Sequence, residues 1–469
     1  MSIDLINMRK NLKNKIKILF IIPPIKKIDE KYSSSPKKNI KFPSLGVAKL
    51  IGFLKLNGYF NLNSIDLRYK NNFIEKNITK KAIDKLINEY NPDLISFSIM
   101  FSNQLDSAEN IARQIKKINK KILILFGGSA LIDIFKDIMN KPTSINFLDG
   151  MVMGGGENPL LKFIDAIEKN KDLNLVPNLI YKNNLKRKYF INEKSFNRDK
   201  KHIKIMPIFN SADLNDMIPI EVSIGCYWGK CSFCSCSKDC LINNYKIISF
   251  KKIVNQINKL KKKHGRKLFV FYDESIPPKY LQDFSREIIK RKIDINWRTS
   301  LCLDPILLRD PYIIKDMKAS GCQSISFGIE SFSDPVLKSM RKIHNSKTAI
   351  EIIKRFKEYG IKVYLNIIIN FPTETKKDTL KTINFLINYT NLYEKATISL
   401  FYLYKNSYIF KYPKEFGIKK IFPSKSSIYN YKSLSGLSRK EIKEVIFLIN
   451  KKVGSKASFN FDTSKYLND

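Results

Sequence analysis

Three cysteines near the middle of the chain have the residue type and the spacing of metal ligands. Cys226, Cys231 and Cys234 fall within one short segment. A loop of that length can wrap its sulfur atoms around one corner of a compact cluster, and thiolates select iron–sulfur clusters or zinc. Both metals normally take four ligands, so three cysteines leave one position open. A structural zinc site is the alternative, with Cys236 or Cys240 as its fourth ligand.

A series of alternating strands and helices must position this loop. We expect helices such as 251–263 and 348–359 between strands at 220–224, 268–272, 295–299, 324–328, 363–370 and 397–402. Six strand–helix repeats predict a partial (β/α)6 barrel, and parallel strands present ligands at their carboxyl ends. The cysteine loop follows directly on the first strand.

The N-terminal part of the chain shows a second alternating series. Strands are predicted at 16–22, 63–67, 93–100, 121–126 and 150–153, and helices at 45–56, 82–90, 105–118 and 158–168. This order predicts a doubly wound α/β domain, with a parallel sheet between two layers of helices.

The predicted domains are 1–175, a charged linker at 176–215, the barrel at 216–405 and a small, mostly helical region at 406–469. A short strand is expected in the linker near Pro207. Helix 439–451 begins with the capping box formed by Ser438 and Glu441.

The cysteine segment resembles the C-x3-C-x2-C hallmark of the radical S-adenosylmethionine (radical SAM) superfamily, with Phe233 as the aromatic residue before the last cysteine. The first gap holds four residues here, and we expect Gly229 to absorb the extra one. The resemblance implies a [4Fe–4S] cluster on Cys226, Cys231 and Cys234. One iron then binds S-adenosylmethionine, whose reductive cleavage releases a 5′-deoxyadenosyl radical.

Later segments extend this resemblance over residues 216–405. Asp273-Glu274 stands where the family places acidic contacts to the methionine amino group, Ser300 ends the third strand, and Glu330 lies in a "GIES"-like segment. Asn370 opens a "GFPGET"-like turn in which Asn370 and Thr373 replace two glycines. The resemblance implies that S-adenosylmethionine is surrounded by Phe233, Glu274, Ser300, Glu330 and Asn370. It assigns no catalytic residue.

The first domain resembles the flavodoxin-like cobalamin-binding module of a large radical SAM subgroup. Its opening Pro43-Ser44-Leu45-Gly46 and its Ser98-Ile99-Met100 element match that subgroup, and Gly127-Gly128 follows at a typical spacing. The resemblance implies cobalamin contacts at Ser98, Gly127 and Gly128. Pro43 stands where other cobalamin proteins have a histidine, so we expect cobalt without a protein histidine as lower ligand. The alternative is a degenerate domain that no longer binds cobalamin.

The formal net charge of +41 permits a polyanion partner, but lysine, asparagine and isoleucine are abundant throughout, as codon bias would produce. Lysine also far outnumbers arginine, which bidentate phosphate contacts favour. No apolar run is long enough for a membrane span. Clustered cysteines point to a metal rather than to disulfides, so we expect a cytoplasmic protein.

Three functions are compared. The first is a radical SAM enzyme that uses cobalamin to methylate or rearrange an unactivated carbon, with a reductant such as flavodoxin or ferredoxin. The second is a radical SAM enzyme without cobalamin that acts on RNA or a peptide. The absence of any cysteine before Cys226 argues against a methylthiotransferase with a second cluster. The third is a zinc or nucleic-acid-binding protein, which leaves the two α/β series unexplained.

Overall fold

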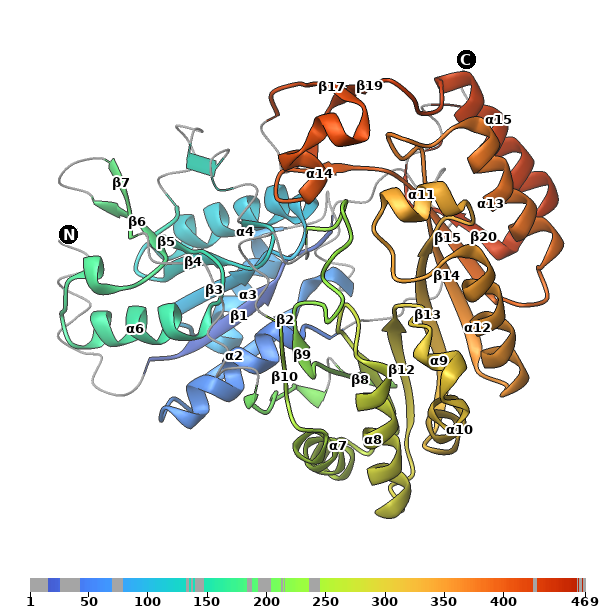
Figure 1. The fold of residues 1–469 in the computed structure, drawn as a ribbon. Helices are drawn as coiled ribbons and strands as arrows, with labels where there is room; N and C mark the ends of the chain where they lie inside the picture. Colours follow the sequence, from blue (N-terminus) through green and yellow to red (C-terminus); the bar gives the residue numbers. More distant parts are fainter. Residues whose placement is uncertain are drawn as a thin grey trace. The chain divides into compact units, whose positions relative to one another are not determined.

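The structure is a computed structural model (Figure 1). It describes residues 16–25, 43–69, 79–131, 147–183, 188–192, 204–211, 216–235, 245–424 and 428–461, with a few single positions besides. The described parts belong to two compact units that divide at Asn215 and Asp216. Cys236, Cys240 and His202 lie outside the described residues.

The first unit is built on a seven-stranded sheet in the order β2-β1-β3-β4-β5-β6-β7. Its strands are β1 (Ile18–Ile22), β2 (Leu62–Asp66), β3 (Leu94–Ser98), β4 (Leu123–Gly127), β5 (Gly150–Val152), β6 (Leu179–Asn183) and β7 (Lys188–Ile191). The first five are parallel in the flavodoxin-like order. The predicted doubly wound domain is confirmed.

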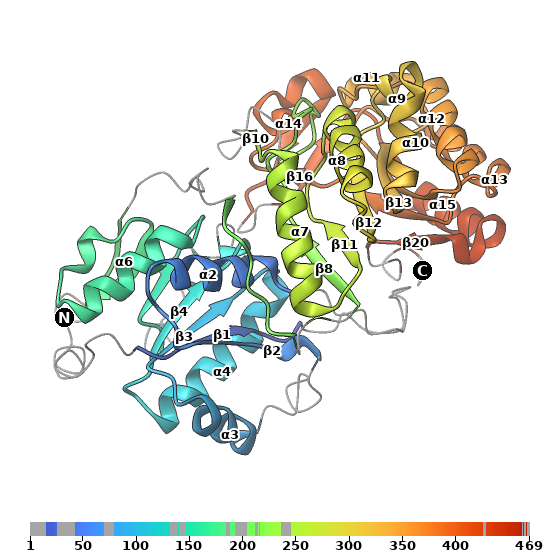
Figure 2. The ribbon, with the colours of Figure 1, turned by 90° about the horizontal axis from the view of Figure 1, so that it is seen from below.

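Helices cover both faces of this sheet because its strand residues are buried on both sides. Phe20 and its alternate neighbours pack against α2 (Leu45–Leu56) and α6 (Glu157–Glu168). Leu19 and Ile21 pack on the opposite side against α3 (Lys80–Tyr90) and α4 (Leu105–Ile118). Figure 2 shows the α2 side and the α3/α4 side separated by the sheet. Such two-sided burial is typical of parallel sheets.

The expected linker at 176–215 is not a plain connection. Its first part forms β6 and β7, which extend the sheet as antiparallel strands. No strand forms at Pro207; instead the Ile208 amide donates to the Ala48 carbonyl of α2 at 2.9 Å.

The second unit contains a seven-stranded parallel sheet whose spatial order follows the chain. Its strands are β8 (Met217–Ile220), β11 (Leu268–Phe271), β12 (Asn296–Leu301), β13 (Cys322–Glu330), β14 (Lys362–Ile369), β15 (Lys395–Leu400) and β20 (Ala457–Phe459). The predicted barrel strands are present, and β20 is an addition from the tail. The first strand was expected at 220–224 but ends at Ile220. The segment β9 (Ser223–Ile224) turns away to pair with β10 (Lys246–Ile247).

Right-handed crossovers between sequential parallel strands place all connecting helices on one face. These helices are α7 (Phe250–His264), α8 (Pro278–Lys290), α9 (Ile306–Arg309), α10 (Pro311–Ala319), α11 (Asp334–Ser339), α12 (Ser346–Glu358) and α13 (Lys376–Asn388). Figure 1 shows α8 and α12 running along the outside of the strands. The carboxyl ends of the strands therefore share one edge, where the cysteine loop begins.

The tail after β15 combines helices with short strands. Its helices are α14 (Tyr408–Lys411) and α15 (Arg439–Lys452), and its strands besides β20 are β16 (Leu403–Tyr404), β17 (Ile418–Ile421), β18 (Ile428–Tyr429) and β19 (Tyr431–Ser433). The predicted capping box of α15 is confirmed: Ser438 and Glu441 each accept from the other's backbone amide. None of the helices in the described ranges is long and apolar enough to cross a membrane.

Replacing Gly128 with alanine should destabilise the first unit. Gly128 has φ +112, and a Cβ there would lie 2.3 Å from the Ile99 carbonyl oxygen. We expect a loss of about 2 kcal/mol or more in the free energy of unfolding, measured by denaturant titration of the cofactor-free protein. Gly46→Ala is the control, since a Cβ at Gly46 meets nothing within 4 Å. Equal stability of the two variants would contradict the prediction.

Candidate functional site

The segment that leads into the cysteine loop is fixed by a buried carboxylate. Asp273, just after β11, is 6% exposed and accepts from the Val222 amide, the Ser223 amide and the Ser223 hydroxyl. Burial raises the pKa of Asp273 to about 7, and these hydrogen bonds oppose the rise. Its neighbour Glu274 is exposed, with no side-chain hydrogen bond or ion pair among the described residues. Asp273 thus positions the loop, and only Glu274 faces solvent.

The loop itself continues the sheet for one residue and then turns. Cys226 forms an isolated parallel bridge with Ser275, and the Cys234 amide donates to the Cys231 carbonyl at 3.3 Å. Gly229 has φ +57, a conformation that costs a residue with a Cβ. This conformation suits the role expected of Gly229 in the longer first gap.

Side chains and backbone groups far away in the sequence anchor the loop. Tyr227 donates its hydroxyl to Asp304 at 3.2 Å, and Trp228 donates its indole N–H to the Arg341 carbonyl at 3.0 Å. Ser232 is fully buried. Its backbone amide donates to the Met340 carbonyl, and its carbonyl accepts from the Ile409 amide. These are long-range contacts without a local pattern, so the sequence did not reveal them.

Phe233, the aromatic residue of the motif, is half-buried and packs against the apolar cluster under the loop. That cluster is formed by Val336, Met340, Phe371, Phe401, Leu403, Ile409, Phe416 and Ile418. The ammonium group of Lys342 lies 5.9 Å from the centroid of the Phe233 ring. The aromatic ring therefore anchors the last turn of the loop between this apolar cluster and a cation.

Lys342 is the central charge of the site, and the sequence analysis missed it. Its side chain is only 4% exposed and lies 3.4 Å from the Glu330 carboxylate. Burial disfavours the ammonium charge, but Cys231 and Glu330 outweigh burial and raise the pKa of Lys342. Burial raises the pKa of Cys231 to about 12, which the charge of Lys342 opposes.

Glu330 occupies a strained position at the end of β13. Its φ is +71, and the pairing of β13 with β14 shifts register between Gly328 and Glu330. A Cβ at Gly328 would lie 2.7 Å from Glu330 Oε1, so only glycine leaves room for the carboxylate. Burial raises the pKa of Glu330, and Lys342 opposes that rise. Backbone strain of this kind concentrates at functional sites.

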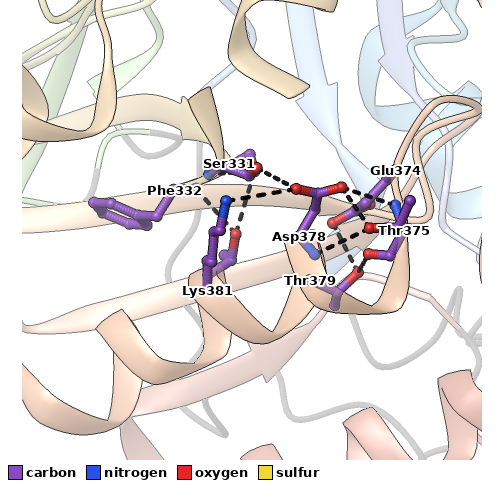
Figure 3. A network of polar contacts seen from close by, with 9 residues as sticks. Ser331, Phe332, Glu374, Thr375, Asp378, Thr379 and Lys381 are labelled. Atoms are coloured by element: carbon purple, nitrogen blue, oxygen red, sulfur yellow. Dashed lines mark hydrogen bonds and ion pairs between the residues drawn. The ribbon is translucent and has the colours of Figure 1, made fainter. Parts of the chain in front are cut away.

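A network of hydroxyls and carboxylates joins the segment that directly follows Glu330 to the start of α13 (Figure 3). The Phe332 amide donates to the Thr382 hydroxyl, and Ser333 donates to Asp378. Asp378 also forms the capping box of α13 with Thr375. The loop after β13 and the turn after β14 are thereby tied to one helix N-terminus.

The turn after β14 begins at Asn370, whose φ is +62. Asn370 Oδ1 accepts from the Leu437 amide at 2.6 Å, so the tail closes over the turn. Thr373, the second replaced glycine, has no positive φ and donates to Ser339 at 3.1 Å. Ser300 is half-buried near the end of β12, and its side chain makes no hydrogen bond among the described residues.

In the first unit, strand pairing brings two of the expected cobalamin residues together. Ser98 and Gly127 are register partners of β3 and β4, and Gly128 follows directly. Gln104, which the sequence analysis missed, is fully buried and donates to the Pro23 carbonyl at 2.7 Å. It also accepts from the Met100 amide at 2.8 Å. The loops after β1 and β3 are thus joined at the topological switch point, where such folds bind ligands.

The donor set fits an iron–sulfur cluster. Cys226, Cys231 and Cys234 are free thiols, and Cys231 interacts electrostatically with both of the others. Within the described ranges, no three His, Cys, Asp or Glu side chains are grouped as ligands of a single ion. A cubane spreads its thiolates over separate irons, whereas zinc gathers them on one ion. Three free thiols on one short loop therefore fit an iron–sulfur cluster.

Comparison with protein families matches the two units separately. The radical SAM superfamily matches residues 220–386, and the B12 binding domain matches residues 41–163. The chain is a radical SAM enzyme with a cobalamin-binding domain. The cofactors of these two domains are a [4Fe–4S] cluster, S-adenosylmethionine and cobalamin. The fold class and the cofactors expected from the sequence are confirmed.

Curated relatives are distant. An uncharacterised methyltransferase of Pyrococcus horikoshii is 26% identical over 395 residues, which are 82% of this chain and 80% of that protein. An anaerobic magnesium-protoporphyrin IX monomethyl ester cyclase of Rubrivivax gelatinosus is 25% identical over 358 residues. That match covers 73% of this chain and 61% of the cyclase.

Solved structures share the fold. The radical SAM methyltransferase TsrM from Kitasatospora setae, with cobalamin and a [4Fe–4S] cluster bound, has a TM-score of 0.62 at 14% identity. The match covers 84% of this chain and 74% of TsrM. The cobalamin-dependent radical enzyme OxsB, with aqua-cobalamin and S-adenosylmethionine bound, has a TM-score of 0.67 at 15% identity. That match covers 92% of this chain and 66% of OxsB.

Replacing Lys342 with methionine should destabilise the second unit, because it leaves the Glu330 carboxylate buried without its partner. We expect a loss of about 3 kcal/mol, measured as the free energy of unfolding of the cluster-free protein. Lys338→Met is the matched control, since Lys338 is exposed on α11. A Lys342 variant as stable as this control would show that the pair is not buried in solution.

The pH dependence of stability should identify Glu374. Glu374 is fully buried and accepts from the Phe371 amide and the Thr379 hydroxyl, while burial raises its pKa to about 7. The unfolded chain therefore releases this proton at a lower pH than the folded protein does. As a result, the free energy of unfolding falls as pH rises from about 4.5 to 7.

The Glu374→Gln variant should lack this fall. We expect the stability of the wild-type protein relative to the variant to drop by up to about 3 kcal/mol across that interval, measured by denaturant titration at several pH values. Glu358→Gln, at an exposed position of α12, controls for the loss of a charge. Parallel profiles of the wild-type protein and Glu374→Gln would contradict the assignment.

Proposed function

We propose that this enzyme transfers a methyl group to an unactivated carbon of a small molecule or peptide, using both S-adenosylmethionine and cobalamin. The observation that carries the proposal is the presence of both cofactor domains in one chain. Several relatives that share this chain's sequence pattern are named methyltransferases. They include a bacteriochlorophyllide d C-12(1)-methyltransferase of Chlorobaculum tepidum, 24% identical over 178 residues, and the hopanoid C-3 methylase of Methylococcus capsulatus, 22% identical over 305 residues.

In this proposal Cys226, Cys231 and Cys234 hold the cluster in the 216–405 barrel. The bound cofactors supply a 5′-deoxyadenosyl radical and a methyl group. The residues of this chain bind and orient them and exclude water. A reductant such as flavodoxin or ferredoxin supplies the electrons, and the protein works in the cytoplasm.

We assign the contacts to S-adenosylmethionine to five residues: Phe233, Glu274, Ser300, Glu330 and Asn370. Glu330 has the strongest support, because its strained backbone aims a buried carboxylate beside Lys342 and Cys231. Glu274 is supported by its place next to Ser275, which pairs with Cys226. Asn370 contacts S-adenosylmethionine through its backbone in this proposal, because its side-chain oxygen already accepts a hydrogen bond from the Leu437 amide.

In the 1–175 domain we propose that Ser98, Gly127 and Gly128 contact cobalamin. They lie on neighbouring strand ends, and a Cβ at Gly127 has only the Phe97 carbonyl within 4 Å. Residue 43 is a proline with no side-chain ligand. The cobalt is therefore expected to carry no protein imidazole as its lower ligand.

A second candidate is ring formation or rearrangement without methyl transfer. It is favoured by the resemblance to the Rubrivivax gelatinosus cyclase over 73% of this chain. An RNA substrate is the remaining alternative, and the charge of +41 is its support. RNA binding that weakens steeply with added salt would favour it, because phosphate contacts release counterions.

The deciding experiment is anaerobic purification with iron, sulfide and hydroxocobalamin, followed by metal analysis and an absorption spectrum. We expect about four irons per chain together with retained cobalt. The Cys226/Cys231/Cys234→Ala variant should lose the iron, and the Cys322→Ala control should keep it. Incubation with S-adenosylmethionine and reductant should then yield 5′-deoxyadenosine and methylcobalamin.

Each other outcome has a definite meaning. Iron without cobalt would remove the cobalamin part of the proposal and leave radical chemistry alone. Bound cobalt that is never methylated would favour ring formation or rearrangement over methyl transfer. Zinc in place of iron and sulfide would overturn the proposal.

A further inference from the structure

The face of the barrel sheet that carries no helices is polar. In β14 every second residue is buried and apolar, and the positions between these residues are exposed or half-buried. β12 and β15 show the same alternation of exposure. Because successive side chains of a strand point to opposite faces, the more exposed set lies on the face away from the helices. Five polar residues of this open face are Ser300, Ser326, Asn366, Thr397 and Ser399.

Strand pairing brings these polar side chains together. Ser300 is the register partner of Ser326, and Asn366 is the register partner of Thr397. The side-chain amide of Asn366 donates to the Ser326 hydroxyl at 3.2 Å, so side chains of β13 and β14 meet on this face. Hydroxyl and amide groups therefore form one continuous surface across β12, β13, β14 and β15.

The composition of this surface indicates that it contacts water or a polar ligand. Where the interior of a barrel is a packed core, bulky branched apolar residues fill it. Hydroxyl and amide groups are costly to bury unless each finds a hydrogen-bond partner. A flat apolar ligand on this face would leave such groups unsatisfied, so the face is suited to a ligand that donates and accepts hydrogen bonds.

Two cations lie on the same face, toward the amino ends of the strands. Arg298 is the register partner of Ser324, which in turn is the partner of Lys362. A guanidinium, a hydroxyl and an ammonium group thus share one row across three strands. Both cations are exposed. Arg298 donates to the side-chain oxygen of Gln323 at 3.4 Å, and neither cation forms an ion pair among the described residues.

The acidic groups of these strands are at the opposite end. Within β11, β12, β13, β14 and β15, which the structure describes in full, the one acidic residue is Glu330. It ends β13 and is paired with Lys342. Nothing in these strands neutralises the row of Arg298 and Lys362, so the amino half of the open face attracts anions.

We propose that the open face binds the substrate, and that the substrate is a polar small molecule whose carboxylate or phosphate group is held by Arg298 and Lys362. Arginine presents a planar fork of donors that matches either anion. Three residues follow Arg298 in β12, so about 10 Å separate its row from the carboxyl edge of the sheet. An elongated molecule then keeps its anionic end at this row while its reacting carbon lies near the cluster loop. The inference rests on the proposed function, because it takes this face as part of the same active site.

The test measures the binding of two anionic probes, glycerol 3-phosphate and succinate, with neutral glycerol for comparison. The reconstituted holoenzyme with S-adenosylmethionine is titrated at constant ionic strength, and an apparent Kd is obtained from the rise in melting temperature. We expect at least one anion to bind, and Arg298→Gln to weaken its binding about tenfold or more, because charge-assisted hydrogen bonds are lost. A response to glycerol 3-phosphate alone would identify a phosphate ester as the substrate group, and a response to succinate alone a carboxylate.

Arg286→Gln is the matched control. Arg286 lies on α8, on the helix side of the sheet, where it pairs with Asp316. Its replacement removes the same charge, so this variant controls for the general attraction of anions to a chain with a net charge of +41. Arg286→Gln should bind the probes as the wild-type enzyme does, and glycerol should change no melting temperature.

Two results would overturn the inference. If neither anion binds the wild-type enzyme, or if Arg298→Gln binds both equally well, the open face is a solvated surface and not a substrate site. If zinc protoporphyrin IX binds saturably, as measured from its absorption, and the anions compete with it, the face accepts a flat macrocycle. An enzyme that binds an anion through Arg298 but forms no methylcobalamin would count against methyl transfer and leave the anion site intact.

Discussion

A lysine ammonium group buried among sulfur atoms and a carboxylate is the constraint on which the barrel site depends. Lys342 has a side chain that is 4% exposed, and a charge in such a place is tolerated only when opposite charges surround it. The Glu330 carboxylate supplies that charge. The same ammonium group adds to the effect of burial on His344, whose pKa falls to about 3. The ammonium group also opposes the rise in the pKa of the Cys231 thiol, and the histidine beside it stays neutral.

The strained backbone at Glu330 follows from the same constraint. For the carboxylate to meet Lys342, β13 must leave its register with β14 between Gly328 and Glu330. The space that the carboxylate enters is free only because residue 328 has no Cβ. Behind it, bonds from Ser333 and Thr375 to Asp378 hold the adjoining loops in place. A positive φ persists only where the surroundings determine it in this way.

Local sequence patterns predicted the helices and the helix cap, whose structure is determined by residues close together in the chain. The ranges of α2 and α4 and the capping box at Ser438 agree with the structure because helix periodicity and caps are encoded within a few residues. The spacing of Cys226, Cys231 and Cys234 is a local pattern of the same kind. The first barrel strand was predicted too late in the chain: it runs from Met217 to Ile220 and includes Pro219, which an edge strand such as β8 tolerates.

The contacts that complete the site were not predictable in this way. Trp228 donates to the carbonyl of Arg341, 113 residues away, and neither residue type indicates the other. The bridge between Cys226 and Ser275 arises only from the order of strands in the sheet. The three-residue strand β20 is too short for a periodic pattern, and its place beside β15 is a property of the folded barrel.

The tail shows how a segment without any recognisable motif becomes part of the site. The Ile409 amide donates to Ser232 of the cysteine loop, and the Leu437 amide donates to Asn370. At residue 370 the related sequences suggested a glycine, chosen for its backbone freedom. Asparagine meets the same demand, with φ +62, and its side-chain oxygen adds an acceptor that glycine lacks. The substitution therefore does more than preserve a turn: it ties the tail to the edge of the barrel where the cluster loop lies.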